Sequence, residues 1–151
     1  MAKLGRYSAN RIKHENLTAA KTVEVSDCGT MFTLDSATEF AVTLPSVSSS
    51  GPGWWAEFHI LGAPASANYT VVTNSENVLM GKVFSTHTLI DHKADQTSGA
   101  TVGNHIVEAN TVTFVDSLAV PGDYVKIQCN GTHYIATAFA SASTGITITA
   151  E

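Results

Sequence analysis

The sequence predicts an all-β protein: a single β-sandwich or barrel-like domain of about 8–10 short antiparallel strands, with an extended N-terminal arm. Beyond position 21, apolar residues recur with a period of two in short segments bounded by turn residues, which is typical of half-buried strands. The chain contains 19 Thr and 14 Ser, while only 14% of its residues are charged, a composition that favours pleated strands and polar loops. No segment has the apolar spacing of a long amphipathic helix.

The length of 151 residues suits one domain, which at this size buries roughly two-thirds of its unfolded surface. We divide the chain into a basic arm over residues 1–20 and a β domain over residues 21–151. Within the domain, residues 85–109 show weak periodicity and several turn residues, so we expect a long loop excursion carrying one or two short strands. Because periodicity does not reveal which strands are neighbours, sandwich and barrel both stay open.

Three strands are expected in the first third of the β domain, each from alternating apolar residues. Their apolar residues are Val23 and Val25 in the first, Phe32 and Leu34 in the second, and Phe40, Val42 and Leu44 in the third. A loop should follow over residues 45–53, because this stretch contains two prolines that cannot donate ladder hydrogen bonds and two glycines that loosen the backbone.

The segment WWAEFHIL, residues 54–61, predicts a strand whose side chains alternate between two faces. The face that we assign to the core carries Trp54, Ala56, Phe58 and Ile60. The opposite face carries Trp55 and ends at Leu61, two large apolar side chains that would need a partner surface.

Two further strands are expected before the excursion, over residues 69–73 and 78–84. Gly81 interrupts the second of them and would mark a β-bulge.

The C-terminal third has the pattern of a meander. Val112 and Phe114 predict one strand, and a turn follows at residues 121–123. Ile146 and Ile148 alternate with threonines and predict the last strand.

Between these strands, the stretch DYVKIQCNGTHYIATAFA, residues 123–140, predicts a β-hairpin. The dipeptide Asn130-Gly131 supplies the positive φ angles that a two-residue type I′ turn requires. Such a turn would pair Cys129 with Thr132, Ile127 with Tyr134 and Val125 with Ala136 on the core face. The other face would carry Tyr124, Lys126, Gln128, His133, Ile135 and Thr137. We expect this hairpin to be structural, with no catalytic group on either face.

Charge divides the chain unevenly. Residues 1–21 contain five basic residues against Glu15 alone, whereas residues 22–151 contain three lysines against twelve acidic residues. A basic, weakly apolar arm on an acidic body suits docking onto an acidic protein partner. Nucleic acid is not expected as a partner, because phosphate would repel the acidic body. No membrane association is expected either, and the N-terminal residues lack the apolar core of a signal peptide, so we expect the protein to be made and kept soluble.

Candidate catalytic and metal-binding residues are few. The segment HTLIDHKAD contains metal-binding side chains at His87, Asp91, His92 and Asp95. Their spacing lacks the paired short intervals of zinc sites, so we expect no metal and no other cofactor. The chain has no Gly-x-Ser-x-Gly motif, and Cys28 and Cys129 are predicted to be buried, unreactive thiols. We therefore do not expect an enzyme.

The order of several pieces between residues 17 and 149 is similar to that of a known family. The pieces are LTAAKTVEVSDCGTMFTLDSATEFAVTLP, GPGWWAEFHI, NYTVVT and VTFVDSLAVPGDYVKIQCNGTHYIATAFASASTGITIT. In this order they resemble tailed-phage virion proteins described as capsid decoration, or cement, proteins and related head-fibre or tail modules. The resemblance implies a virion structural protein without catalysis, on the outside of an icosahedral head, often as a trimer at threefold or pseudo-threefold positions.

Such proteins attach to the major capsid protein after the shell has expanded and brace it against internal DNA pressure. By this resemblance, the chain would be made in the host cytoplasm and would reside on the outer surface of the capsid. The residues that we expect in a capsid-binding arm are Leu4, Arg6, Tyr7, Arg11, Ile12 and Lys13. The residues that we expect in a subunit interface, most simply of a homotrimer, are Trp55, Leu61, Tyr124 and Ile135.

A phage tail or head-fibre module that binds a carbohydrate or host surface is the alternative. It would use Trp54, Trp55 and Tyr134 as exposed stacking surfaces. The two functions differ in where these aromatic side chains lie, because a decoration protein would bury them between subunits or in the core.

Overall fold

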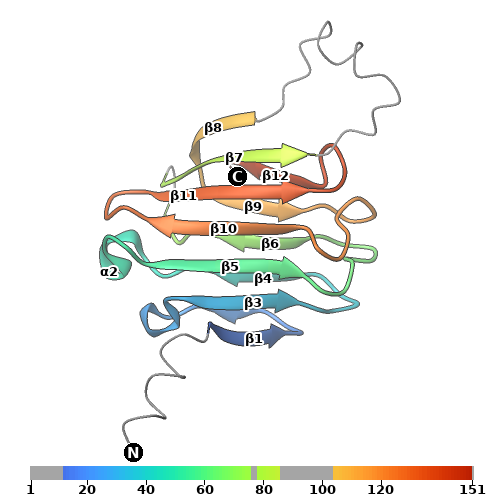
Figure 1. Ribbon diagram of the computed structural model, residues 1–151, viewed down its shortest axis with the longest axis horizontal. Helices are drawn as coiled ribbons and strands as arrows, with labels where there is room; N and C mark the ends of the chain where they lie inside the picture. The colour runs from blue at the N-terminus through green and yellow to red at the C-terminus, as the bar shows by residue number, and fades with distance from the viewer. Residues whose placement is uncertain (1–11, 76–77, 86–103, 151) are drawn as a thin grey trace, which may run out of the picture.

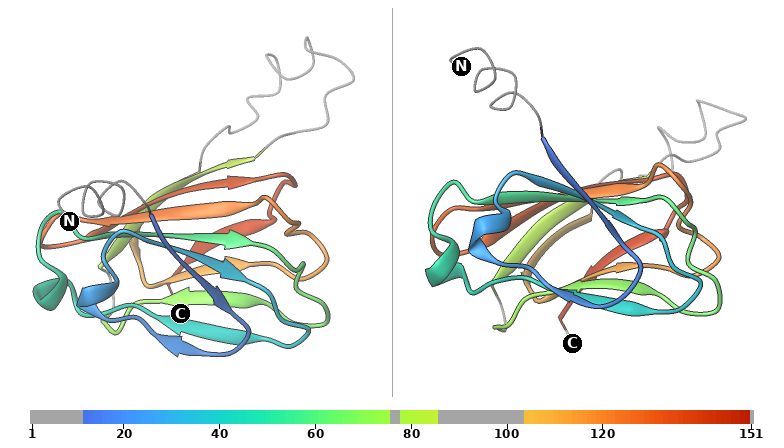
Figure 2. Two further views of the ribbon diagram at one scale, coloured as in Figure 1. Left: turned by 60° about the horizontal axis from the view of Figure 1, so that its bottom comes forward. Right: turned by 90° about the horizontal axis from the view of Figure 1, so that it is seen from below.

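The computed structural model describes residues 12–75, 78–85 and 104–150, in which two β-sheets pack face to face (Figure 1). Figure 2 shows the two layers from other sides. The predicted all-β, sandwich-like class is confirmed. The described strands number twelve, more than expected, and both sheets contain parallel as well as antiparallel pairs. The prediction of antiparallel pairing throughout is therefore wrong.

The larger sheet contains seven strands and the smaller one five. In order across the seven-stranded sheet, the strands are β1 (Lys13–Leu17), β3 (Thr30–Leu34), β5 (Trp55–Ile60), β10 (Tyr124–Cys129), β11 (Tyr134–Ala140), β7 (Leu79–Ser85) and β8 (Asn104–Ala109). Across the five-stranded sheet they are β12 (Ile146–Thr149), β9 (Thr111–Phe114), β6 (Tyr69–Val72), β4 (Phe40–Thr43) and β2 (Lys21–Thr22). Two single helical turns, η1 (Val25–Asp27) and α2 (Val47–Ser50), lie in connections between the sheets.

The first six strands account for most of the parallel pairing, because successive strands fall in alternate sheets. β1, β3 and β5 run parallel in the seven-stranded sheet, and β2, β4 and β6 run parallel in the five-stranded sheet. Parallel neighbours need a crossover connection, and here the intervening strand in the opposite sheet supplies it. Turn residues mark where a strand ends but not whether the chain returns to the same sheet, so the sequence did not reveal this arrangement.

The core lies between the sheets and follows the predicted alternation. In β5 and the residue before it, the buried side chains are Trp54, Ala56, Phe58 and Ile60. The Phe58 ring stacks on that of Phe32 from β3, with centroids 5.2 Å apart. The buried Tyr134 hydroxyl donates a hydrogen bond to the Pro45 carbonyl at 2.9 Å, and burial raises the pKa of this phenol.

The first predicted strand is mostly wrong. Val23 is buried as expected, but Val25 is 42% exposed and begins the η1 turn. The turn forms because the Asp27 carboxylate accepts a hydrogen bond from the Glu24 amide at 3.1 Å, which competes with strand formation. An alternation of only two valines was too short to distinguish these outcomes.

The predicted loop over residues 45–53 contains the α2 turn, so it is not wholly irregular. The Ser46 hydroxyl caps this turn by accepting a hydrogen bond from the Ser49 amide at 3.2 Å. The bulge predicted at Gly81 is confirmed, since the pairing of β7 with β8 shifts register between Leu79 and Gly81. β8 lies in the predicted excursion, as one of its expected short strands, and residues 86–103 lie outside the described part.

The arm predicted over residues 1–20 is too long, because its C-terminal part is β1, an edge strand of the seven-stranded sheet. A charged network attaches this strand to the domain. The Lys13 ammonium lies 2.6 Å from the buried Asp27 carboxylate, and the Lys21 ammonium lies 2.6 Å from Glu15 and 3.8 Å from Asp27. Residues 13–17 therefore belong to the folded domain.

The ionisation of Asp27 links this network to pH. Burial opposes ionisation of the carboxyl, but the hydrogen bonds from Lys13 and the Glu24 amide, together with the Lys21 charge, outweigh burial and lower its pKa. Because the folded-state pKa is the lower one, the unfolded chain binds the proton more readily. The stabilisation is therefore complete above the unfolded pKa of about 3.9 and is lost as pH falls through the folded value.

Replacing Asp27 with Asn should lower the free energy of unfolding by about 1–3 kcal/mol near neutral pH, because the two lysines lose their buried acceptor. Urea unfolding should show the difference from wild type shrinking as the pH is lowered below about 4. The matched control is Asp35→Asn, at a carboxylate with no ion pair among the described residues. An equal difference at neutral and acid pH would contradict this role of Asp27.

The β10–β11 hairpin forms where it was predicted, but with a longer loop. Cys129 pairs with Tyr134, so the loop contains four residues, Asn130–His133, and the predicted two-residue turn is wrong. The Asn130 side-chain oxygen accepts hydrogen bonds from the Thr132 amide at 2.9 Å and the His133 amide at 2.7 Å, which stabilises the wider loop. The register differs by two residues, and because strand side chains alternate with that period, the predicted core face is preserved.

Gly131 has a φ of +97°, which side chains rarely adopt. Gly131→Val should lower the free energy of unfolding by about 1–2 kcal/mol, since a β-branched side chain is strained at positive φ. Thermal unfolding would measure the loss. Gly131→Asn is the matched control, because Asn tolerates positive φ better than other residues with a side chain. Equal stability of the Val and Asn variants would show that backbone strain at position 131 does not lower the free energy of unfolding.

Candidate functional site

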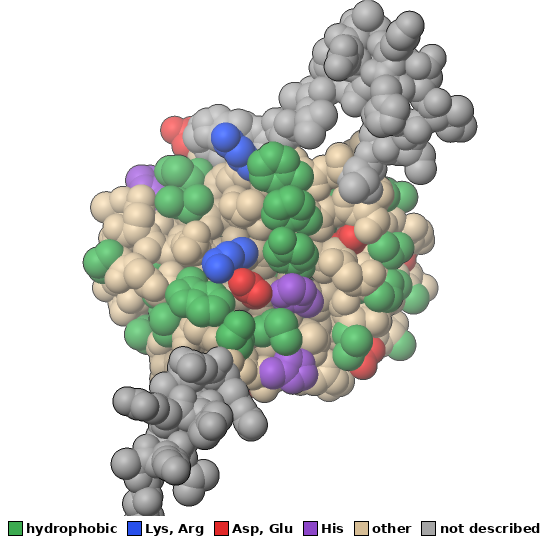
Figure 3. Space-filling view, in the orientation of Figure 1, with side chains coloured by type: hydrophobic (Ala, Val, Ile, Leu, Met, Phe, Trp, Pro, Cys, Tyr) green, Lys and Arg blue, Asp and Glu red, His purple; other side chains and the backbone are tan. Residues whose placement is uncertain are grey.

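The outer face of the seven-stranded sheet is the candidate functional site. No described strand or helix lies over it, and Figure 3 shows a column of hydrophobic side chains across this face that ends at a histidine. Register explains the column. One row of residues across six neighbouring strands contains Asn16, Thr33, His59, Tyr124, Phe139 and Phe84.

Four of these side chains form a continuous ring stack, which we call the aromatic row: His59, Tyr124, Phe139 and Phe84. Ring centroids are 4.9 Å apart between His59 and Tyr124, and 5.2 Å apart at the next two steps. Interplanar angles are 10°, 22° and 21°. The spacing is close to the strand separation of about 4.7–4.9 Å, so the sheet itself sets the stack.

This geometry decides what the aromatic row offers to a ligand. Neighbouring rings occupy one another's faces, so the row presents mainly ring edges to solvent. Sugar rings bind aromatic side chains through an exposed face, which the interior of this stack does not provide. A ridge of ring edges instead suits contact with a broad, shape-matched apolar surface.

A charged group lies beside the aromatic row, around Trp55. The Lys126 ammonium lies 4.7 Å from the centroid of the Trp55 ring and 3.3 Å from the Glu57 carboxylate. Glu57 also lies 3.2 Å from the His59 imidazole. The cation therefore covers the Trp55 indole that sequence alternation directed outward.

Three of the four predicted interface residues lie on this face. Ile135 is 40% exposed, and Tyr124 and Trp55 are partly exposed. Leu61, at 53% exposed, lies just beyond the end of β5. Sequence reasoning missed Phe139, which is 44% exposed and central to the stack.

The sequence indicates the face on which Phe139 lies, but not which aromatic residues lie beside it. It has the same parity as Ile135 in β11, so alternation places it on the outer face. Phe84 could not be added from the sequence, because its position beside Phe139 depends on the parallel pairing of β11 with β7. His59 likewise required the pairing of β5 with β10.

The predicted capsid-binding residues Leu4, Arg6, Tyr7 and Arg11 lie outside the described residues. Ile12 is described and is 56% exposed, beside the edge strand β1. Lys13 is engaged by Asp27, which raises the pKa of its ammonium group, so this lysine has a structural role in the domain.

Two of the three aromatic residues proposed as carbohydrate-stacking surfaces are in the core. Trp54 is 2% exposed and Tyr134 is fully buried, so neither can contact a ligand at the surface. Their rings meet edge to face with centroids 5.8 Å apart. Of the two cysteines, Cys129 is buried as predicted, whereas Cys28 is exposed, which corrects the prediction of a buried thiol.

The histidines and acids considered for metal binding, at positions 87–95, lie outside the described residues. Within the described ranges, His, Cys, Asp and Glu side chains do not gather in any group of three or more that could hold a metal ion. Nor does the described part of the chain contain a helix with the length and apolar character needed to cross a membrane.

Comparison of the chain with protein-family models, with curated proteins and with solved structures found no match.

Proposed function

We propose that this chain is a non-enzymatic virion structural protein, a capsid decoration protein that binds the outer surface of the major capsid protein shell and stabilises the expanded head. The observation that carries the proposal is the aromatic row on an uncovered sheet face. The resemblance to phage decoration proteins suggests the capsid as the binding partner, and the aromatic row is a surface suited to such a contact.

Physical considerations favour a macromolecular partner for this face. Monomeric soluble proteins rarely expose contiguous apolar patches larger than a few hundred Å², and interface centres are enriched in aromatic side chains. The rings are held by pairing of their strands, so little side-chain entropy is lost when a partner covers them. A ridge with these properties acts as a rigid anchor.

Charge on the same face supports an acidic partner. Lys126 and Lys82 both lie on this face; Lys126 is paired with Glu57 at 3.3 Å, whereas Lys82 has no ion pair among the described residues. Because residues 22–151 contain many more acidic than basic residues, a cation without an acidic partner beside the aromatic rings favours docking of this face onto an acidic surface.

In this proposal the face serves two contacts: Trp55, Leu61, Tyr124 and Ile135 pack against a neighbouring subunit of a homotrimer, and Phe139 and Phe84, at the other end of the aromatic row, contact the shell. Leu4, Arg6, Tyr7, Arg11 and Ile12 contact the shell. Lys13 is reassigned from the shell contact to the attachment of β1. The protein would be made in the host cytoplasm and reside on the outer surface of the capsid, with no cofactor, nucleic acid or membrane among its partners.

Incubation with expanded, undecorated capsids, followed by sedimentation and a native mass measurement, tests the docking face. Phe139→Asp should reduce capsid occupancy by at least about tenfold, because it places a charge in the centre of an apolar contact. Thr149→Asp, on the outer face of the five-stranded sheet, is the matched control and should bind normally. Undiminished attachment of a folded Phe139→Asp variant would exclude the aromatic row as the docking surface.

Removal of residues 1–11 tests the arm separately. A chain beginning at Ile12 keeps β1 and its contact with Asp27, so its thermal unfolding should match that of the full chain. The capsid occupancy of this shortened chain should fall. In the full chain, replacing the apolar residues Leu4, Tyr7 and Ile12 together with Ala should weaken attachment more than removing the charges of Arg6 and Arg11. The reason is that exposed ion pairs contribute only about 0.2–1 kcal/mol each. Full occupancy by the shortened chain would show that the arm is not the tether.

A further inference from the structure

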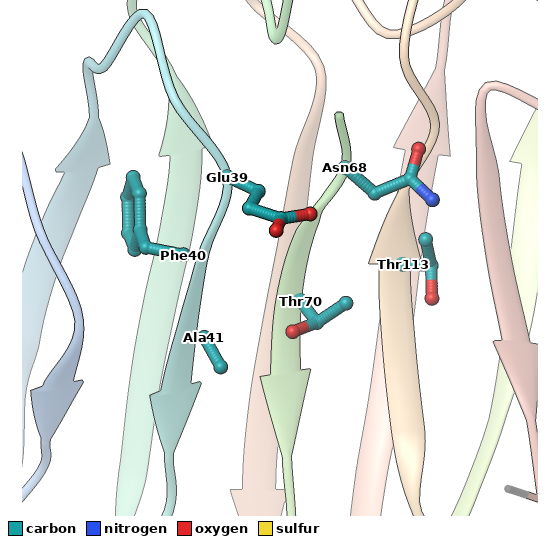
Figure 4. A pocket seen from close by; sticks show the side chains of 6 residues that line it. All are labelled: Glu39, Phe40, Ala41, Asn68, Thr70 and Thr113. Atoms are coloured by element: carbon teal, nitrogen blue, oxygen red, sulfur yellow. The ribbon is translucent and has the colours of Figure 1, made fainter. Parts of the chain in front are cut away.

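The outer face of the five-stranded sheet contains a hollow of about 380 Å³ (Figure 4). Its lining residues are Glu39, Phe40, Ala41, Asn68, Thr70 and Thr113. This volume is within the range of roughly 300–1,000 Å³ typical of small-molecule sites. The hollow lies on the opposite side of the sandwich from the aromatic row, so both surfaces can be occupied at once.

Sheet register builds the floor of the hollow. Ala41, Thr70 and Thr113 are direct neighbours on β4, β6 and β9. The small Ala41 side chain leaves space that a larger residue would fill. Glu39 and Asn68 immediately precede β4 and β6, and Figure 4 shows their side chains at the rim above the two threonines.

The polar groups of the hollow are available for a ligand. Thr113 is only 7% exposed, yet its hydroxyl forms no hydrogen bond with any residue of the described ranges. Because this hydroxyl lines an open hollow and has no protein partner among the described residues, it is free to bond to water or to a ligand. Thr70 and Glu39 also lack side-chain hydrogen bonds within the described part of the chain.

Asn68 differs because one end of its amide is already fixed. Its side-chain oxygen accepts a hydrogen bond from the Asp116 amide at 2.7 Å. This contact sets the orientation of the group, so the amide nitrogen, with its two donor hydrogens, is directed toward the Thr113 side of the hollow (Figure 4).

The set of groups defines the chemistry of the ligand. Glu39 accepts hydrogen bonds, the Asn68 nitrogen donates them, and the two threonine hydroxyls do both. A sugar hydroxyl needs such a combination, since it donates to one group while accepting from another. The methyl groups of Ala41 and the threonines supply apolar contacts for ring C–H groups. None of the lining residues is basic, and the Glu39 carboxylate would repel an anion.

We propose that this hollow binds one unit of a neutral sugar, with Thr113, Thr70, Glu39 and Asn68 contacting its hydroxyl groups. The site goes beyond the proposed capsid role and does not depend on it. A chain docked through the aromatic row would leave the hollow open to solvent, where it could bind a glycan in the surroundings.

Titration of the isotope-labelled full chain by nuclear magnetic resonance tests the proposal. The probes are the methyl glycosides of glucose, galactose and mannose, with glucuronate as the anionic counterpart. At least one neutral glycoside should shift the amide signals of residues 39–41, 68–70 and 113, and glucuronate should bind more weakly. If no neutral glycoside shifts these signals, or if glucuronate binds more tightly, the proposal is overturned.

Variants then assign the contacts. Thr113→Val keeps the side-chain shape but removes the hydroxyl, and Glu39→Gln removes the charge at an exposed position. Each should weaken binding by about tenfold, the loss expected for one hydrogen bond to a ligand. Thr149→Val makes the same change outside the hollow and should bind like the wild type. Unchanged binding by both Thr113→Val and Glu39→Gln would place the sugar elsewhere, and capsid attachment can be measured independently of either result.

Discussion

Packing of the two sheets around one layer of alternating apolar side chains is the constraint on which both outer surfaces depend. Phe32 and Phe58 stack within this layer, and Tyr134 reaches across it to hydrogen-bond the Pro45 carbonyl. A one-residue slip of any central strand would move its buried side chains into water. Core burial therefore fixes strand register, and register in turn decides which outward side chains become neighbours.

The outward side chains of the two sheets differ in chemistry. The seven-stranded sheet carries stacked rings together with Lys82 and Lys126 among its outward-facing residues, whereas the outward positions of the five-stranded sheet are dominated by threonine, including Thr70, Thr113 and Thr147. A stack of rings in contact with one another favours a large apolar partner. A concave array of hydroxyl, amide and carboxylate groups favours a small hydroxylated ligand. In the two proposals, the core of the sandwich separates a surface for a macromolecular partner from a site for a small ligand.

The two edges of the seven-stranded sheet are formed by β1 and β8, and the β1 edge shows how the domain holds a peripheral strand. The Asp27 carboxylate binds Lys13 of β1 and the η1 turn at once, so one buried charge connects the first strand to the loop that follows β2. This attachment fixes β1 at the edge of the seven-stranded sheet.

The sequence by itself determined the properties that depend on nearest neighbours along the chain. Alternation identified the β class and the buried face of β5, which carries Ala56, Phe58 and Ile60. The turn dipeptide located the β10–β11 hairpin, and Gly81 marked the bulge in β7. These features follow from the period of two and from the φ preferences of single residues, which act locally.

Only the tertiary structure decided which strands lie side by side. The parallel pairing of β11 with β7 brings Phe84 beside Phe139, and the neighbouring positions of β6 and β9 bring Thr70 beside Thr113. The missed η1 turn and the four-residue hairpin loop have a different cause, because there local side-chain hydrogen bonds of Asp27 and Asn130 outweighed the alternation pattern. Strand pairing is selected by burial of the whole core, a sum over residues distant in sequence, so no local pattern contains it.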